Sequence, residues 1–320
     1  MKASIIIPSL NAEKTIGKTI FSLLEQTLKP EEIIVVDGGS TDKTLETVEK
    51  IAEKEKTLKL FKKKNFGISA SRNLGAKKAS TNIIVFLDSD VTMEKKWLEK
   101  LLVPLKKENV FCSCGKYLIE LDGSLSSDFF SFVIGSSSFQ GYSIAFRKND
   151  FLETGGFDEK MKYCEDPEFT LRAFLSGKKL VETKAETMHR SYSIKERIKS
   201  NLKYSFYDAV LFKKKFSFFS NPFNLFQAPK NVKLVFGFYW ILFLSVILAV
   251  SWFLLTKNMF SFIFLLLPAL TGCMKILLYK NETKHKNNFF VLLVFSFFAL
   301  LLFELIKGIG FLNGLIQGKT

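Results

Sequence analysis

The chain has 320 residues, with 46 lysines and arginines against 31 aspartates and glutamates, and a formal net charge of +15. Hydrophobic residues make up 48% of it, which excludes a disordered chain, and four cysteines are too few for a disulfide scaffold. Of 35 phenylalanines, 21 follow residue 205, whereas 38 of the basic and 29 of the acidic residues fall in the first 230. We therefore expect a soluble domain followed by a membrane region.

Strands and helices are predicted to alternate in the first part of the chain. Short apolar runs predict strands, and helical periodicity predicts the helices between them: strand 4–8, helix 12–26, strand 33–36, helix 43–53 with Asp42 as its N-cap, strand 58–61, helix 70–78 and strand 83–87. This alternation indicates an α/β fold with a parallel sheet covered on both faces. Ligands of such sheets bind beyond the carboxyl ends of the strands, where Asn11, Asp37 and Asp88 lie.

The sequence Asp88-Ser89-Asp90 is the strongest single indication of chemistry. No GxGxxG or GxxxxGK[ST] sequence is present, so a dinucleotide fold and a P-loop are both disfavoured. A DxD is common in solvated loops, but this one directly follows the buried run IIVFL. Because side chains alternate along a strand, we expect both carboxylates on one face, where two hard oxygen ligands suit Mg²⁺ or Mn²⁺.

Several sequence runs, taken in order, resemble the family 2 glycosyltransferases. These are SIIIPSLNAEKTIGKTIFSLLEQTLKPEEIIVVDGGSTDKT, GISASRNLGAKKAS, IIVFLDSD, GGFDE and YCEDPEFTLRAFLSGKKL, which together cover about residues 3 to 190. The resemblance implies a GT-A fold, a mostly parallel sheet flanked by helices that binds a nucleotide-diphosphate sugar. It also implies a divalent cofactor, Mg²⁺ or Mn²⁺.

The same resemblance implies roles for residues of the donor site. Pro8 and Asn11 would line the nucleotide pocket, and Asp37 would accept an N–H of the base, which favours a UDP- or GDP-sugar. Arg72 would approach the diphosphate, since a guanidinium matches phosphate oxygens, and Asp88 would contact the nucleotide. In one departure from the family pattern, the residue after the asparagine is Ala12, with Glu13 one place on.

The metal ligands and the general base are also inferred from the resemblance. Asp90 would hold the metal, with His189 as a further ligand, although a single histidine of this kind can also be purely structural. Asp166 would be the general base that takes the proton of an attacking sugar hydroxyl. Its alternative role is that of an N-cap before Pro167 at the first helical position, and both roles can hold together.

Three apolar runs near the C-terminus predict membrane spans at 234–255, 259–279 and 289–307, so the expected domains are 1–193, 194–230 and 231–320. The lysines before the first run and between the second and third predict a multi-pass protein of the cell membrane with a cytoplasmic catalytic domain. Apolar residues between lysines in 194–219 predict a basic amphipathic helix on the membrane lipids, or else a helix packed on the domain.

These features predict an inverting glycosyltransferase whose acceptor is a hydroxyl of a lipid-linked saccharide at the cytoplasmic membrane face. A base such as Asp166 is needed for a hydroxyl acceptor, and membrane spans suit a lipid. The alternatives are transfer to a polyprenyl phosphate and a non-catalytic, membrane-tethered nucleotide-sugar binding protein. We expect no nucleic-acid partner, because the membrane region explains the basic bias and no nucleic-acid motif appears.

Overall fold

The computed structural model describes residues 1–119, 143–189 and 194–215, with a few single residues beyond them. The chain divides into two compact units. The first includes Met1–Glu120 and Ser136–Arg190, and the second includes Ser191–Ala228 and Val232–Thr320. The predicted site residues all belong to the first unit, which is described first.

The N-terminal half of the first unit is a parallel α/β arrangement. Its elements are β1 (Ala3–Ser9), α1 (Ile16–Leu24), β2 (Glu32–Asp37), α2 (Thr44–Ala52), β3 (Leu58–Lys62), α3 (Ile68–Lys78) and β4 (Ile83–Leu87). The strands β2, β3 and β4 join β1 in an all-parallel order, β3-β2-β1-β4. All seven elements were predicted, although α1 is shorter than expected. Helix α2 begins at Thr44 with Lys43 as its N-cap, so the prediction of Asp42 as the N-cap is wrong.

The second half of this unit extends the sheet with strands of mixed direction. It contains β5 (Val91–Met93), α4 (Trp97–Leu102), a 3₁₀ helix (Val103–Lys106), β6 (Cys112–Ile119), β7 (Ser143–Arg147), α6 (Lys148–Glu153), α7 (Glu165–Leu175) and β8 (Leu180–His189). The eight-stranded sheet runs β3-β2-β1-β4-β7-β6-β8-β5. Strand β7 is antiparallel to both β4 and β6, and β8 is parallel to β6 but antiparallel to β5. The expected parallel sheet is therefore found in the first four strands, with one further parallel pair between β6 and β8, and the sheet as a whole is mixed.

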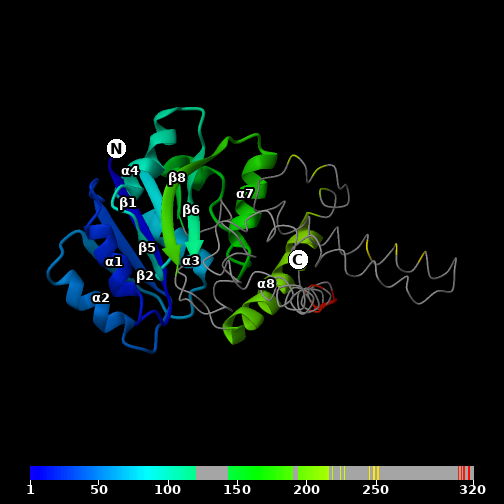
Figure 1. The fold of residues 1–320 in the computed structure, drawn as a ribbon, viewed down its shortest axis with the longest axis horizontal. Coiled ribbons are helices and arrows are strands. Elements are labelled where there is room, and N and C mark those ends of the chain that lie inside the picture. Colours follow the sequence, from blue (N-terminus) through cyan, green and yellow to red (C-terminus); the bar gives the residue numbers. More distant parts are fainter. Residues whose placement is uncertain are drawn as a thin grey trace, which may run out of the picture. The chain divides into compact units, whose positions relative to one another are not determined.

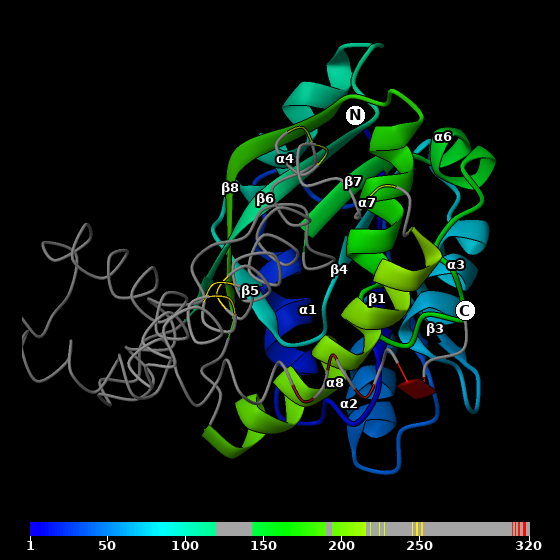
Figure 2. The same cartoon turned by 90° about the vertical axis from the view of Figure 1, so that its right-hand side faces the viewer.

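Alternate side chains of the central strands supply a hydrophobic cluster on each face of the sheet. Ile5 and Val85 belong to the cluster on the face that α1, α2 and α4 cover (Figure 1). Ile6 and Phe86 belong to the opposite cluster, which α3, α6 and α7 complete (Figure 2). The unit is thus a three-layer α/β/α sandwich, whose central strands are buried on both faces.

Aromatic side chains dominate the face beneath α3, α6 and α7. Phe86 of β4 has its ring centroid 5.0 Å from that of Phe151 on α6 and 5.1 Å from that of Phe157. Phe157 in turn lies 5.1 Å from Phe169 of α7. Tilted and edge-on aromatic pairs at these separations are favourable beyond their buried area. They fix the start of α7 and the loop before it relative to the end of β4.

The described part of the second unit is mainly α8 (Ile194–Lys214), in the segment where an amphipathic helix was predicted. Lys199, Leu202 and Lys203 are exposed, whereas Val210 is buried. No helix among the residues that the structure describes combines the length and the apolar character needed to cross a bilayer. The predicted spans 234–255, 259–279 and 289–307 lie almost wholly outside the described residues.

Candidate active site

The end of β1 and the turn after β2 form the first part of the site. Pro8 is buried in β1 and is in register with Val36, while the ladder between β1 and β4 ends at Ile6, so β4 requires no N–H from Pro8. Asn11 is exposed and has a left-handed backbone, with φ of 52°. Its Oδ1 accepts a hydrogen bond of 2.9 Å from the backbone N–H of Thr41, which joins the two strand ends.

Asp37, the last residue of β2, organises its own turn. Its Oδ1 accepts hydrogen bonds from the backbone N–H groups of Gly39 (2.9 Å) and Ser40 (2.8 Å), and its side chain is buried. A Cβ at Gly38 would lie 2.7 Å from the carbonyl oxygen of Phe66, so only glycine fits this approach. The carboxylate thus holds the strand end in shape, and its contact with a base stays a prediction.

Asp88 and Asp90 follow the end of β4 and have different partners. The strand ends at Leu87, and Ser89 and Asp90 form a turn before β5. The alternation of a strand does not continue through a turn, so pleating does not decide the faces of these carboxylates, and their placement on one face stays a prediction. Each carboxylate has its own partner, Arg72 for Asp88 and His189 for Asp90.

Asp90 and His189, the two predicted metal ligands, lie together. His189 is the last residue of β8 and is opposite Val91 of β5, so the pairing of these strands brings its ring to the DSD turn. Its Nε2 is 2.8 Å from Oδ2 of Asp90, and the imidazole is 1% exposed against 24% for the carboxylate. A buried imidazole beside a half-open carboxylate can serve as one side of a metal site.

Arg72 lies at the centre of the site, buried on α3. Its Nη2 donates to Oδ1 of Asp88 at 2.7 Å, and its Nη1 donates to Oε1 of Glu165 at 2.5 Å. The Cζ atom lies 5.5 Å from the centre of the Phe157 ring, a cation–π distance. With its side chain 2% exposed, Arg72 joins the end of β4 to the start of α7, and its predicted contact with the diphosphate stays a prediction.

The start of α7 differs from the capping alternative for Asp166. The helix begins at Glu165, and its N-cap is Cys164, in a left-handed conformation with φ of 60°. Asp166 and Pro167 both lie inside the first turn, so the prediction of Asp166 as N-cap is wrong. Acidic side chains there are favoured by the helix dipole, and the Asp166 side chain is partly exposed.

The charges around Arg72 shift one another's pKa values. Burial by itself lowers the pKa of Arg72, but the charges of Asp88, Glu165 and Asp166 outweigh it and raise that pKa. Burial raises the pKa of Asp88; Arg72 offsets part of this rise and Asp90 adds to it. Burial likewise raises the pKa of Glu165 in spite of its contact with Arg72. Negative charge thus exceeds positive charge here, which favours a bound cation.

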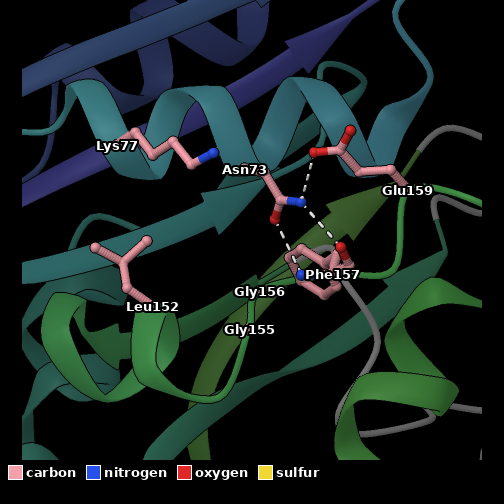
Figure 3. A pocket seen from close by; sticks show the side chains of 7 residues that line it. All are labelled: Asn73, Lys77, Leu152, Gly155, Gly156, Phe157 and Glu159. Carbon is pink, nitrogen blue, oxygen red and sulfur yellow. Dashed lines mark hydrogen bonds between the residues drawn. The ribbon is translucent and has the colours of Figure 1, made fainter.

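A glycine turn before α7 is clamped against α3. In Figure 3 the Asn73 amide points from α3 into this turn, where its Oδ1 accepts from the N–H of Phe157 and its Nδ2 donates to Glu159, at 2.9 and 3.0 Å. Gly156 has φ of 66°, and a Cβ there would lie 2.7 Å from Asn73 Oδ1. A pocket of about 420 Å³ lies beside this turn, and its lining includes Lys77 of α3 and Leu152 of α6.

The donor atoms at the DSD turn fit a divalent cation in part. Asp90 and His189 supply one carboxylate and one imidazole within 2.8 Å of each other. Within residues 1–119, 143–189 and 194–215, no group of three or more His, Cys, Asp and Glu side chains has the spacing of a metal site. A site with two protein ligands leaves its other positions for water and phosphate oxygens, as Mg²⁺ prefers.

Two residues of the site were not singled out from the sequence. Glu165 precedes the predicted base Asp166, and its carboxylate is buried and bound to Arg72. Ser9 has a buried hydroxyl with no hydrogen-bond partner among the described residues, and it is in register with Asp37 at the strand ends. An acidic residue at a buried position could have indicated Glu165, whereas nothing in the sequence distinguishes Ser9 from other strand serines.

Sequence comparisons agree with this geometry. The model of glycosyl transferase family 2 matches residues 4–154. A cholesterol galactosyltransferase of Borreliella burgdorferi is 38% identical over 118 residues, which cover 37% of this chain and 33% of the relative. An uncharacterized glycosyltransferase of Haemophilus influenzae is 39% identical over 123 residues, 38% of this chain and 49% of the relative. The match thus spans a third to a half of the length of these curated relatives.

Solved structures share the fold. The mannosyltransferase PcManGT from Pyrobaculum calidifontis, solved with GDP-Man and Mn²⁺, superposes with a TM-score of 0.62 at 15% identity, over 97% of this chain and 87% of that one. GalNAc-T7, solved with UDP, GalNAc and Mn²⁺, gives a TM-score of 0.55 at 16% identity, over 68% of this chain and 49% of that one. The fold is thus the mixed α/β sheet with flanking helices of the GT-A type. Residues 4–154 thus resemble the glycosyl transferase family 2 domain and have a fold of the GT-A type.

Proposed function

We propose that the chain is an inverting glycosyltransferase that moves a sugar from a nucleotide-diphosphate donor to an acceptor hydroxyl. The observation that carries this proposal is the double ion pair of Arg72. It joins the strand-end carboxylate Asp88 to Glu165, the neighbour of Asp166, and this supports a single site that contains both the DSD turn and Asp166. A donor-binding side and a proton acceptor are the two parts that such a transfer requires.

The donor is proposed to bind at the ends of β1 and β2. Pro8, Asn11 and Asp37 lie there, and the Ser9 hydroxyl adds a buried polar atom without a described partner. The fold neighbours were solved with GDP-Man or with UDP and GalNAc, which supports a UDP- or GDP-sugar.

In the proposed reaction, Asp166 accepts the proton of the acceptor hydroxyl as its oxygen attacks the anomeric carbon of the donor. The departing nucleoside diphosphate leaves from the opposite face, so the anomeric configuration inverts. Mg²⁺ or Mn²⁺ bound by Asp90 and His189 would supply positive charge for the leaving diphosphate. Arg72 holds Asp88 and the start of α7 in place while this charge develops.

We further propose that the acceptor is a lipid-linked saccharide at the cytoplasmic face of the cell membrane. The predicted spans, the exposed Lys199 and Lys203 of α8 beside Leu202, and the relative named cholesterol galactosyltransferase support a lipid partner. A sugar hydroxyl needs the base Asp166, whereas a polyprenyl phosphate, the second candidate acceptor, is already an anion.

Labelled nucleotide sugars test this proposal. Membranes that contain the full chain are incubated with a panel of radiolabelled UDP- and GDP-sugars and Mn²⁺, and the products are extracted with organic solvent. Label in a lipid product whose released glycan contains two or more sugars supports the lipid-linked saccharide. A monosaccharide lipid cleaved by mild acid supports the polyprenyl phosphate instead, and label found only in water-soluble material contradicts a lipid acceptor.

A further inference from the structure

We propose that Glu165 is a positioning residue of the transfer reaction, acting through Arg72 to set Asp88 and Asp166 relative to each other. This inference rests on the proposed function, in which Asp88 lies on the donor side and Asp166 is the base. The observation that supports it is that the buried guanidinium of Arg72 contacts two carboxylates, Asp88 and Glu165, from distant parts of the chain.

The environment of Glu165 shows that its carboxylate has a tertiary role. The side chain is 8% exposed although it stands at the first position of α7, where a carboxylate could face water. A buried carboxylate is costly unless it is paired, and Glu165 is paired with Arg72 Nη1. The helix dipole alone would be satisfied equally well by an exposed acidic residue.

Arg72 can transmit position because its guanidinium is rigid. Its two terminal nitrogens have a fixed separation within one plane, and each binds a different carboxylate. Its plane is held from another side by the ring of Phe157, and its backbone lies in α3. A shift of Glu165 therefore moves or releases Asp88, whereas a lysine ammonium would bind both carboxylates only as a point charge.

The backbone at the start of α7 makes the position of Asp166 depend on the same contact between Glu165 and Arg72. Cys164 has a left-handed conformation immediately before the helix, a strained arrangement that persists only where neighbouring contacts enforce it. Glu165 provides a side-chain contact to α3 at this point, and Ser69 adds a second tie by donating to the carbonyl oxygen of Met161. The direction in which Asp166 leaves the first turn is thus fixed through Glu165.

The chain offers a matched control in Glu168. It lies on the same helix, it is as buried as Glu165, and it also pairs with an arginine, Arg172, at 2.8 Å. Arg172 donates to the backbone oxygens of Thr154 and Gly156, and among the described residues it has no hydrogen bond or ion pair with Asp88. Removing either carboxylate charge leaves an arginine with one partner fewer, but only Glu165 is connected to the proposed reacting groups.

The test compares Glu165→Gln with Glu168→Gln in the full-length chain. Both variants are assayed for nucleoside diphosphate release from the nucleotide sugar that the wild type uses, with Mn²⁺, and for UDP or GDP binding. Because small misplacements of reacting groups cost much rate, Glu165→Gln is expected to lower kcat by about 10- to 100-fold, while KM for the donor stays within about threefold. Glu168→Gln is expected to keep kcat within about threefold of the wild type. The two variants are expected to change the melting temperature by similar amounts.

Arg72→Lys keeps a buried cation between the two carboxylates and carries the test if Glu165→Gln does not fold. Its kcat is expected to fall about as much as that of Glu165→Gln, because a point charge does not fix the orientation of the two carboxylates. Equal kcat values for wild type, Glu165→Gln and Arg72→Lys would overturn the positioning role alone. A wild type that turns over no nucleotide sugar would overturn the proposed function, and the positioning role with it.

Discussion

Glu32 provides a test of the fold at the edge of the sheet opposite the site. It is the first residue of β2, and its carboxylate is 3% exposed. The Oε1 atom accepts hydrogen bonds from the Ser4 hydroxyl at 2.6 Å and from the backbone N–H of Ser80 at 2.6 Å, and Oε2 pairs with Lys59. The carboxylate thus ties β1, β3 and the end of α3 to β2.

These contacts predict a defined dependence of stability on pH. Burial by itself raises the pKa of Glu32, but the hydrogen bonds from Lys59, Ser4 and Ser80 outweigh it and lower the pKa from 4.5 to about 2. A carboxyl with a lowered native pKa stabilises the fold above its unfolded pKa, and this contribution is lost as the pH falls toward the native value. The shift corresponds to about 3 kcal/mol in all, of which about 2 kcal/mol is lost by about pH 3.

The measurement is the free energy of unfolding in urea of the wild type and of Glu32→Gln, between about pH 7 and pH 3. Other acidic groups titrate equally in both proteins, so the difference between the two proteins isolates Glu32. We expect the wild type to lose its advantage over Glu32→Gln by about 2 kcal/mol over this range. A difference that stays constant with pH would refute the reasoning, because it would show that Glu32 titrates alike in the native and unfolded chains.

Three further predictions concern the packing of α3, the donor pocket and the metal. Gly75→Ala is expected to lower stability by about 1–3 kcal/mol in thermal unfolding despite the better helix propensity of alanine, because its Cβ would overlap Ile6 Cγ2; an unchanged melting temperature would contradict this packing. Asp37→Asn should weaken UDP or GDP binding, measured by calorimetry, by about tenfold or more, because the charged acceptor is lost; unchanged affinity would remove Asp37 from the donor pocket. His189→Ala should abolish the extra thermal stabilisation that Mn²⁺ adds to UDP or GDP, and an undiminished Mn²⁺ effect would argue against His189 as a ligand.

The parallel half of the fold could be predicted because its strands are buried on both faces and its helices have one apolar side. Runs such as Ile33–Val36 and Ile83–Leu87 therefore stand out in the sequence. The strands β6 and β7 could not be recognised in the same way, and their antiparallel direction depends on pairing that no local pattern encodes. The mixed character of the sheet is a consequence of tertiary structure.

The site was predictable where residues follow strands and unpredictable where distant segments meet. Asp37 and Asp88 were found because each comes at a strand end. The Arg72–Glu165 ion pair joins residues 93 positions apart, so no spacing could reveal it. The N-cap assignment of Asp166 was wrong because sequence rules favour a turn residue before proline, whereas the structure places the left-handed residue at Cys164.

The most direct test of the proposed chemistry is the turnover of Asp166→Asn. Asparagine keeps the shape of the side chain but cannot accept the acceptor proton as a base. We predict that kcat for sugar transfer falls by about 10²- to 10⁴-fold, while the affinity for the nucleotide sugar with Mn²⁺ stays within about threefold of the wild type. Transfer at the wild-type rate by Asp166→Asn would contradict the assignment of Asp166 as the base, and with it the account of the site.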